Sequence, residues 1–175
     1  MSNQQAAEIL ERHREGVAVA VARQIRSSVP RYRMVDKQAV ANNVKDVLDG
    51  VRVLLTRGDE RQVMGVLNYI MDIRRISGFS VGDFLVAVLC ALPVVRRFFI
   101  AKAISAEAGL KLYEAFEAQV LPLYGRVVIN FIRIAEESDT FPEGMPTIGA
   151  LLSDELAEDF TDPFFITPFD DPQDR

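Results

Sequence analysis

The sequence is poor in the residues that carry most protein chemistry. Its 175 residues include one cysteine, Cys90, and one histidine, His13. A single cysteine excludes an internal disulfide and favours a reducing compartment, so we expect a cytoplasmic protein. A haem site needs a histidine on an apolar helix face, and a metal site needs several clustered ligands. His13 lies in a polar stretch, where we predict a solvent-exposed helical side chain, so we expect no metal and no cofactor.

Signals for catalysis are also missing. Cys90 lies among apolar residues with no cationic neighbour close in sequence, which predicts a small core residue and not a nucleophile. The glycines match no phosphate-loop spacing. We therefore expect no enzymatic activity and assign no catalytic residue.

No apolar run reaches the length of a membrane span. The longest run, residues 84–95, ends at Arg96 and Arg97, whereas a span needs roughly 20 residues. This run predicts a buried core helix. Residues 1–5 show no basic segment leading into an apolar one, so we also expect no signal peptide.

Basic residues gather in small groups along the chain. We interpret them as solvated helix faces, because a sequence pI near 5.0 disfavours nucleic-acid binding. The alternative is a docking site for an acidic partner, formed by Arg96, Arg97 and Lys102. The groups are Arg74–Arg75, Arg96–Arg97 with Lys102, and Arg31 and Arg33 on either side of Tyr32.

Apolar residues repeat at helical spacing along residues 1–137, and no segment alternates as a strand would. Asp36 and Ser80 are expected helix caps, and Gly58 is an expected helix end. Asp59 with Gln62 predicts a further capping box. The fold class is therefore all-α, a bundle of five to six helices with kinks at Pro93 and Pro122. The expected helices cover 3–27, 36–58, 59–77, 80–99 and 105–137.

The last of these helices carries more apolar residues than one core contact needs. Besides its main stripe, it has Tyr113, Tyr124, Val128 and Ile129 on the neighbouring positions. A surplus of this kind predicts a second buried face. We therefore expect a homodimer.

The chain changes character at Ser138. Residues 1–137 carry 19 basic and 15 acidic residues, a net charge of +4, whereas residues 138–175 carry one basic and 10 acidic residues, a net charge of −9. The second region also holds five of the eleven phenylalanines and five of the eight prolines. We divide the chain here into a helical domain, 1–137, and an acidic tail, 138–175, in which residues 147–160 fit one short helix.

The tail predicts a contact with a partner protein. Aromatic anchors fill pockets and carboxylates steer the approach to a basic surface, either on the partner or at the chain's own Arg96–Arg97 region. A solubilising tail is the alternative. Thr147–Leu151 also looks like the peptides that load cargo into encapsulin shells, which makes an encapsulin cargo-type protein the least favoured reading. The expected partner-binding residues are Phe160, Phe164, Phe165, Ile166 and Phe169.

The order of short motifs in the helical domain resembles a known family. Arg31-Tyr32-Arg33 is followed by Ala41-Asn42-Asn43-Val44, by the Arg57-Gly58-Asp59 turn, and by the segment from Arg74 to Ser80. Over residues 5–137, this order resembles the N-terminal domain of RsbR/RsbRD-type stressosome proteins. The resemblance implies a haem-free, globin-like and dimeric sensory domain with no catalytic residues. In those proteins a STAS domain follows; here the acidic tail follows, so we expect no output through a STAS domain.

Two functions are therefore expected. The first is a non-enzymatic signalling adaptor of the stress-response kind, with a dimeric body and a tail that docks on a partner. The alternative is a small-molecule sensor that binds an apolar ligand in its helical body and reports it by a change of shape.

Overall fold

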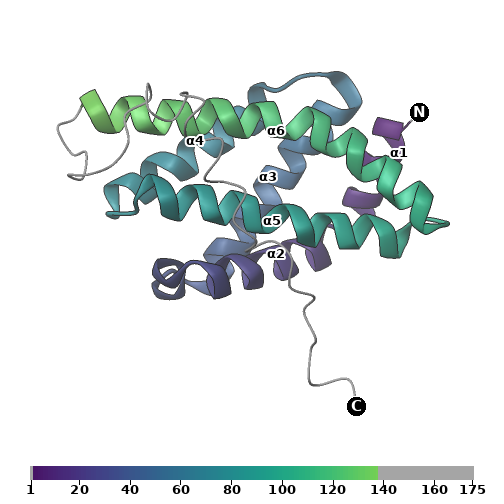
Figure 1. Ribbon diagram of the computed structural model, residues 1–175, viewed down its shortest axis with the longest axis horizontal. Coiled ribbons are helices and arrows are strands. Elements are labelled where there is room, and N and C mark those ends of the chain that lie inside the picture. Colours follow the sequence, from purple (N-terminus) through teal and green to yellow (C-terminus); the bar gives the residue numbers. More distant parts are fainter. Residues whose placement is uncertain (1, 138–175) are drawn as a thin grey trace, which may run out of the picture. The chain divides into compact units, whose positions relative to one another are not determined.

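The computed structural model describes residues 2–137, and all regular elements among them are helical (Figure 1). This part of the chain is all-α, as the apolar and capping patterns predict. Residues up to 131 form one compact unit. The elements are α1 (Ser2–Arg12), α2 (Arg14–Ser28), the short 3-10 helix η1 (Pro30–Met34), α3 (Lys37–Arg57), α4 (Arg61–Ile76), α5 (Val81–Lys102) and α6 (Ala106–Glu137).

Three helix ends form where the sequence predicts them. Asp36 accepts a hydrogen bond from the backbone N–H of Ala39 at 2.8 Å and so caps α3. Gly58 ends α3 at a φ of 67°, in the left-handed region that favours glycine. Before α5, the side chains of Ser80 and Asp83 each accept a hydrogen bond from the other residue's backbone N–H, which completes a capping box.

The start of α4 differs from the prediction. The helix begins at Arg61, and its N-cap residue, Glu60, forms no side-chain capping hydrogen bond. Asp59 instead accepts hydrogen bonds from the backbone N–H and the guanidinium of Arg61, at 3.0 and 2.9 Å. These contacts lower the pKa of Asp59 to about 2. The predicted capping box with Gln62 is therefore wrong, because Asp59 bonds a residue two positions away, outside the helix-capping geometry.

The predicted helix over residues 3–27 is two helices separated at His13. This residue has a φ of −118° and a ψ of 17°, so α1 ends before it and α2 begins after it. Its ring is half-buried and packs edge-on against Phe98, with 5.3 Å between ring centroids. The prediction of an exposed helical histidine is therefore wrong, because α5 supplies a ring contact that local sequence does not show.

Both internal prolines lie inside helices that continue through them, Pro93 in α5 and Pro122 in α6. A proline removes one backbone hydrogen bond and distorts a helix at that point. The ribbon of α6 bends along its length without a break (Figure 1). The last helix is therefore one element and is not split at Pro122.

Helix α5 is central to the packing of residues 2–131. Figure 1 shows it between α2 and α6, with α3 crossing behind it. Ring centroids lie 5.9 Å apart for Phe84 and Phe131 and 5.8 Å apart for Phe99 and Phe116, so α5 and α6 run antiparallel. The apolar residues that recur at helical spacing along α6 are buried, namely Leu112, Phe116, Val120, Leu123, Val127 and Phe131.

Helix α3 meets α4 at backbone distance. A Cβ atom on Gly50 would lie 2.6 Å from the Cα atom of Val63, closer than real Cβ contacts come. Glycine is therefore the residue that fits this position, since it alone lacks a Cβ atom. This close approach fixes the spacing of the two helices.

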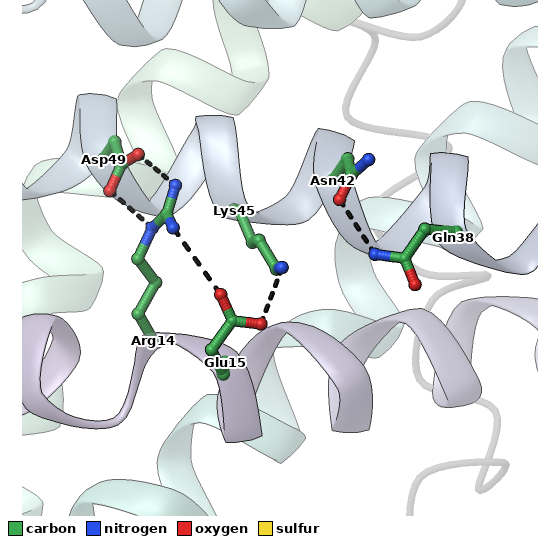
Figure 2. A network of polar contacts seen from close by, with 6 residues as sticks. All are labelled: Arg14, Glu15, Gln38, Asn42, Lys45 and Asp49. Atoms are coloured by element: carbon green, nitrogen blue, oxygen red, sulfur yellow. Dashed lines mark hydrogen bonds and ion pairs between the residues drawn. The ribbon is translucent and has the colours of Figure 1, made fainter.

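A polar network joins α2 to the outer face of α3 (Figure 2). The guanidinium of Arg14 donates to both carboxylate oxygens of Asp49, at 2.8 and 2.5 Å. Glu15 lies 2.6 Å from the Lys45 ammonium and 3.7 Å from the Arg14 guanidinium. These side chains therefore place α2 along α3 while staying in reach of water.

Among the described residues, α5 is the one helix long and apolar enough to cross a membrane, judged by length and composition alone. In the structure, part of α5 is buried. Its buried residues are Phe84, Ala87, Leu92, Val94, Val95 and Phe99.

Candidate ligand-binding site

A partly open cavity of about 90 Å³ lies among α2, η1, α3, α4, α5 and α6. Its wall is almost wholly aliphatic and aromatic, and it contains no charged side chain. All wall residues belong to the compact unit of residues 1–131. They are Val21, Ile25, Tyr32, Val40, Asn43, Val44, Val47, Leu48, Val51, Leu67, Ile70, Phe84, Ala87, Val88, Ala91, Leu92, Val95, Phe116 and Tyr124.

Small side chains on α5 explain why space is left here. Ala87 and Ala91 lie one helical turn apart, and both line the cavity. An alanine side chain ends at Cβ, so these two positions leave room that larger residues would fill. The apolar stripe of α3 supplies another wall, because its valines recur at helical spacing.

Two uncharged polar side chains also face the cavity, Asn43 from α3 and Tyr124 from α6. Neither forms a hydrogen bond with another residue that the structure describes. Burial raises the pKa of Tyr124 to about 12, because a phenolate would lose its hydration there. Both residues are half-buried, so the wall offers two polar groups that are not bonded to protein and are available to a ligand.

Tyr32, the third polar residue of the wall, belongs to a stacked cluster with Arg74 and Phe79. The rings of Tyr32 and Phe79 meet edge to face at 4.8 Å, and the Arg74 guanidinium lies 5.1 and 5.5 Å from their centroids. Burial raises the pKa of Tyr32, and the charge of Arg74 offsets this in part. Arg74 is 6% exposed, and its Nε has no partner among the described residues.

The prediction that Arg74 belongs to a solvated helix face is therefore wrong. Two aromatic rings from other segments cover its guanidinium, and the attraction between a cation and a ring face compensates part of the lost hydration. The sequence next to Arg74 contains no sign of this, because Tyr32 lies far away along the chain.

The same cluster joins the segments that carry the family resemblance. Arg26 donates to the carbonyl oxygen of Tyr32 at 2.9 Å and so holds η1 in place. Arg31 donates to the carbonyl oxygen of Gly78 and lies 3.4 Å from the Asp83 carboxylate. The segments around Tyr32 and around Phe79 are therefore in direct contact, which gives their residues a structural role.

Cys90 is half-buried on α5, and its Sγ donates to the carbonyl oxygen of Ala87 at 3.3 Å. Burial raises the pKa of the thiol, which keeps it protonated near neutral pH. Within the part of the chain that the structure describes, no three His, Cys, Asp or Glu side chains gather as a metal site would require.

The predicted docking residues Arg96, Arg97 and Lys102 are all exposed near the end of α5. The Lys102 ammonium lies 5.9 Å from the ring centroid of Phe98. The second half of this hypothesis, the acidic tail, falls outside the described residues. So do its expected anchors, Phe160, Phe164, Phe165, Ile166 and Phe169.

The residues expected at a dimer face divide into two groups. Tyr113 is buried and donates to Glu117 at 2.7 Å, and Tyr124 lines the cavity. Ile129 is 43% exposed, as is Leu121 on the same helix. Two of the four surplus apolar residues, Tyr113 and Tyr124, therefore pack within the helical body. The sequence pattern indicated a single core-facing stripe on α6, but in the structure α6 makes contacts beyond that stripe.

Sequence reasoning missed Asn43 and Tyr124 as a pair. The signal for Asn43 was present, since it lies three residues after Val40 and four before Val47, within the apolar stripe. A polar residue at such a position predicts a special environment. That Tyr124 faces the same cavity depends on how α6 packs against α3 and α5, which spacing along the chain does not reveal.

Comparisons with protein families, with curated proteins and with solved structures find no significant match to this chain. The likeness to stressosome domains therefore rests on the short motifs quoted above.

Proposed function

We propose that this protein is a non-enzymatic sensory module whose helical body binds a small apolar molecule in the cavity. The cavity itself is the observation that carries this proposal. Protein interiors have few voids larger than a water molecule, and space left among apolar side chains costs stability because packing contacts are lost. A wall of this composition therefore favours a binding role.

A ligand in this cavity would act through the packing of the helices around it. Wall residues come from α2, α3, α4, α5 and α6, so a bound molecule contacts most of the helical body. It stabilises the arrangement that encloses it in proportion to its affinity and concentration. The resemblance to stressosome input domains supports a signalling role for such a shift.

The first test asks whether the full chain carries or takes up an apolar molecule. Native mass spectrometry of the purified protein should show a small-molecule adduct, and toluene should shift the NMR signals of the wall valines. The variant Ala91→Leu fills the cavity and should abolish both signals. The matched control is Ala101→Leu, at an exposed position of the same helix.

Two outcomes would contradict the sensor proposal. A wild-type chain that shows no adduct and no toluene shift would contradict the sensor proposal. Equal binding by Ala91→Leu would also contradict it, since the ligand would then bind elsewhere.

The second candidate is a cytoplasmic, dimeric signalling adaptor whose tail docks on a partner protein. The exposed apolar side chains Leu121 and Ile129 on α6 support a contact surface on the helical domain. The charge of −9 and the phenylalanines of residues 138–175 support a docking role for the tail. This reading involves no nucleic acid and no membrane span.

Light scattering and pull-down experiments test the adaptor. We expect a dimer at micromolar concentration, with about 2,000 Å² or more buried in total for an obligate interface. The double variant Phe164→Ala/Phe165→Ala should lose partner capture and keep the dimer and the helicity. A monomer in solution would contradict the dimer, and unchanged capture would place the contact on the helical domain.

A further inference from the structure

The electrostatics of the cavity wall limit the charge of its ligand. No Asp, Glu, Lys or Arg side chain lines the cavity. A carboxylate or an ammonium placed there would lose its hydration without gaining a partner of opposite charge, which costs more than an apolar contact returns. The site therefore disfavours ions.

The two unpaired polar groups limit the ligand further. The hydroxyl of Tyr124 can donate and accept a hydrogen bond, and the amide of Asn43 can do both. Both residues are half-buried and neither has a partner among the described residues, so a purely hydrocarbon ligand would gain no hydrogen bond from them. A ligand hydroxyl or carbonyl group would satisfy at least one of them.

The size of the cavity gives an upper bound. A cavity of about 150 Å³ in another protein holds one benzene ring, and the present cavity, at about 90 Å³, is smaller. Because the cavity is partly open, a molecule of one ring fits if part of it lies at the mouth, and a larger one requires rearrangement of the wall.

We propose that Tyr124 and Asn43 are specificity-determining residues, and that the cavity selects a small neutral molecule bearing a hydroxyl or carbonyl group. This inference rests on the proposed ligand-binding function. Tyr124 supplies a hydrogen bond from α6 and Asn43 one from α3, while the surrounding valines, leucines and alanines contact the apolar part of the ligand. The polar group thereby fixes the ligand's orientation.

The test uses phenol and toluene, which differ by a hydroxyl in place of a methyl group. Both are titrated into the full wild-type chain and into Tyr124→Phe, with binding followed by NMR. Loss of one hydrogen bond should weaken phenol binding about three- to tenfold in Tyr124→Phe, whereas toluene binding should stay equal or become tighter. Toluene thus also reports that the variant keeps its cavity.

Matched controls exist for both residues. Tyr113→Phe removes a hydroxyl that bonds Glu117 on the same helix, outside the cavity wall, and should leave phenol binding unchanged. Asn43→Ala should weaken phenol binding, whereas Asn42→Ala should not, because Asn42 is exposed and bonds Gln38. Benzoate should not bind the wild-type chain.

The outcomes separate this inference from the proposed function. Failure of both toluene and phenol to bind the wild-type chain would contradict the ligand-binding function itself. Binding of both, with phenol affinity unchanged in Tyr124→Phe and in Asn43→Ala, would overturn the specificity inference alone. Benzoate binding as tight as that of phenol would overturn the claim of neutrality.

Discussion

Two faces of the same helix, α3, differ in how their polar groups are satisfied. On the outer face, Asp49 and Lys45 are paired with Arg14 and Glu15 from α2 (Figure 2). On the inner face, Asn43 lies among valines beside the cavity and has no partner among the described residues. All three α3 side chains are half-buried; those on the outer face are paired with side chains of α2, whereas Asn43 has no such partner.

This difference indicates separate roles for the two faces. Ion pairs near water add little to stability, since water would solvate the same charges. An amide in a largely apolar wall that has no protein partner keeps its hydrogen bonds available for a ligand. We therefore assign the outer face to the joining of α2 and α3, and the inner face to the proposed ligand.

The largest effect on stability should come from a substitution at the contact between α3 and α4, and not from either of these two faces. Gly50→Ala places a Cβ atom against the Val63 backbone, so the helices must separate, and we expect a loss of about 3 kcal/mol in the free energy of unfolding. Gly65→Ala is the control, because nothing lies within 4 Å of its Cβ. It should gain about 0.5–1 kcal/mol, since alanine favours the helix. Urea unfolding measures both, and equal stabilities would contradict the close contact.

On the inner face, Val51→Ala should cost about 2 kcal/mol, because Val51 is 1% exposed and its removal enlarges a cavity that already exists. The same variant should bind toluene more tightly, since more space is available. Thermal unfolding with and without toluene measures both effects. A stability loss without tighter binding would show that the wall collapses into the space.

On the outer face, the coupling between Arg14 and Asp49 should be smaller, about 0.5–1 kcal/mol in a double-mutant cycle to alanine. Their side chains are 34% and 33% exposed, so water competes with the pair. The coupling should fall further as salt is added. A salt-independent coupling as large as the effect of Val51→Ala would remove the contrast between the two faces.

The smallest effect concerns another exposed pair, Glu60 and Arg126, which join the start of α4 to α6. The Arg126 guanidinium donates to both oxygens of Glu60, at 2.9 and 2.6 Å, and lowers the pKa of that carboxyl. The pair's contribution is therefore present above the unfolded-state pKa of about 4.3 and is lost as pH falls through the lower folded-state pKa. An NMR titration should find the Glu60 pKa below its usual value in the wild type and restored in Arg126→Gln.

Local sequence was sufficient for most helix ends. The caps at Asp36, Gly58 and Ser80 follow from bonds within a few residues, and all three are confirmed. The cap at Asp59 is wrong, because the neighbouring Arg61 side chain competes for its carboxylate. Such errors stay local and shift a helix start without changing the fold class.

Residues whose role depends on distant segments were not predictable in the same way. The cover over Arg74 comes from Tyr32, and the ring beside His13 comes from Phe98. The sequence around Arg74 and around His13 predicts solvent exposure, because residue spacing shows only which residues are neighbours on the same helix. Contacts between helices placed both residues against aromatic rings.

The all-α class and the apolar stripes of α3, α5 and α6 follow directly from residue order, since helical periodicity and capping bonds involve residues a few positions apart. The cavity does not follow from residue order. It exists because Ala87 and Ala91 of α5 come to lie among the valines of α3, with Tyr124 of α6 on the same wall. Space of this kind is set by how whole helices pack, and the volume left between them depends on side chains that are far apart in sequence.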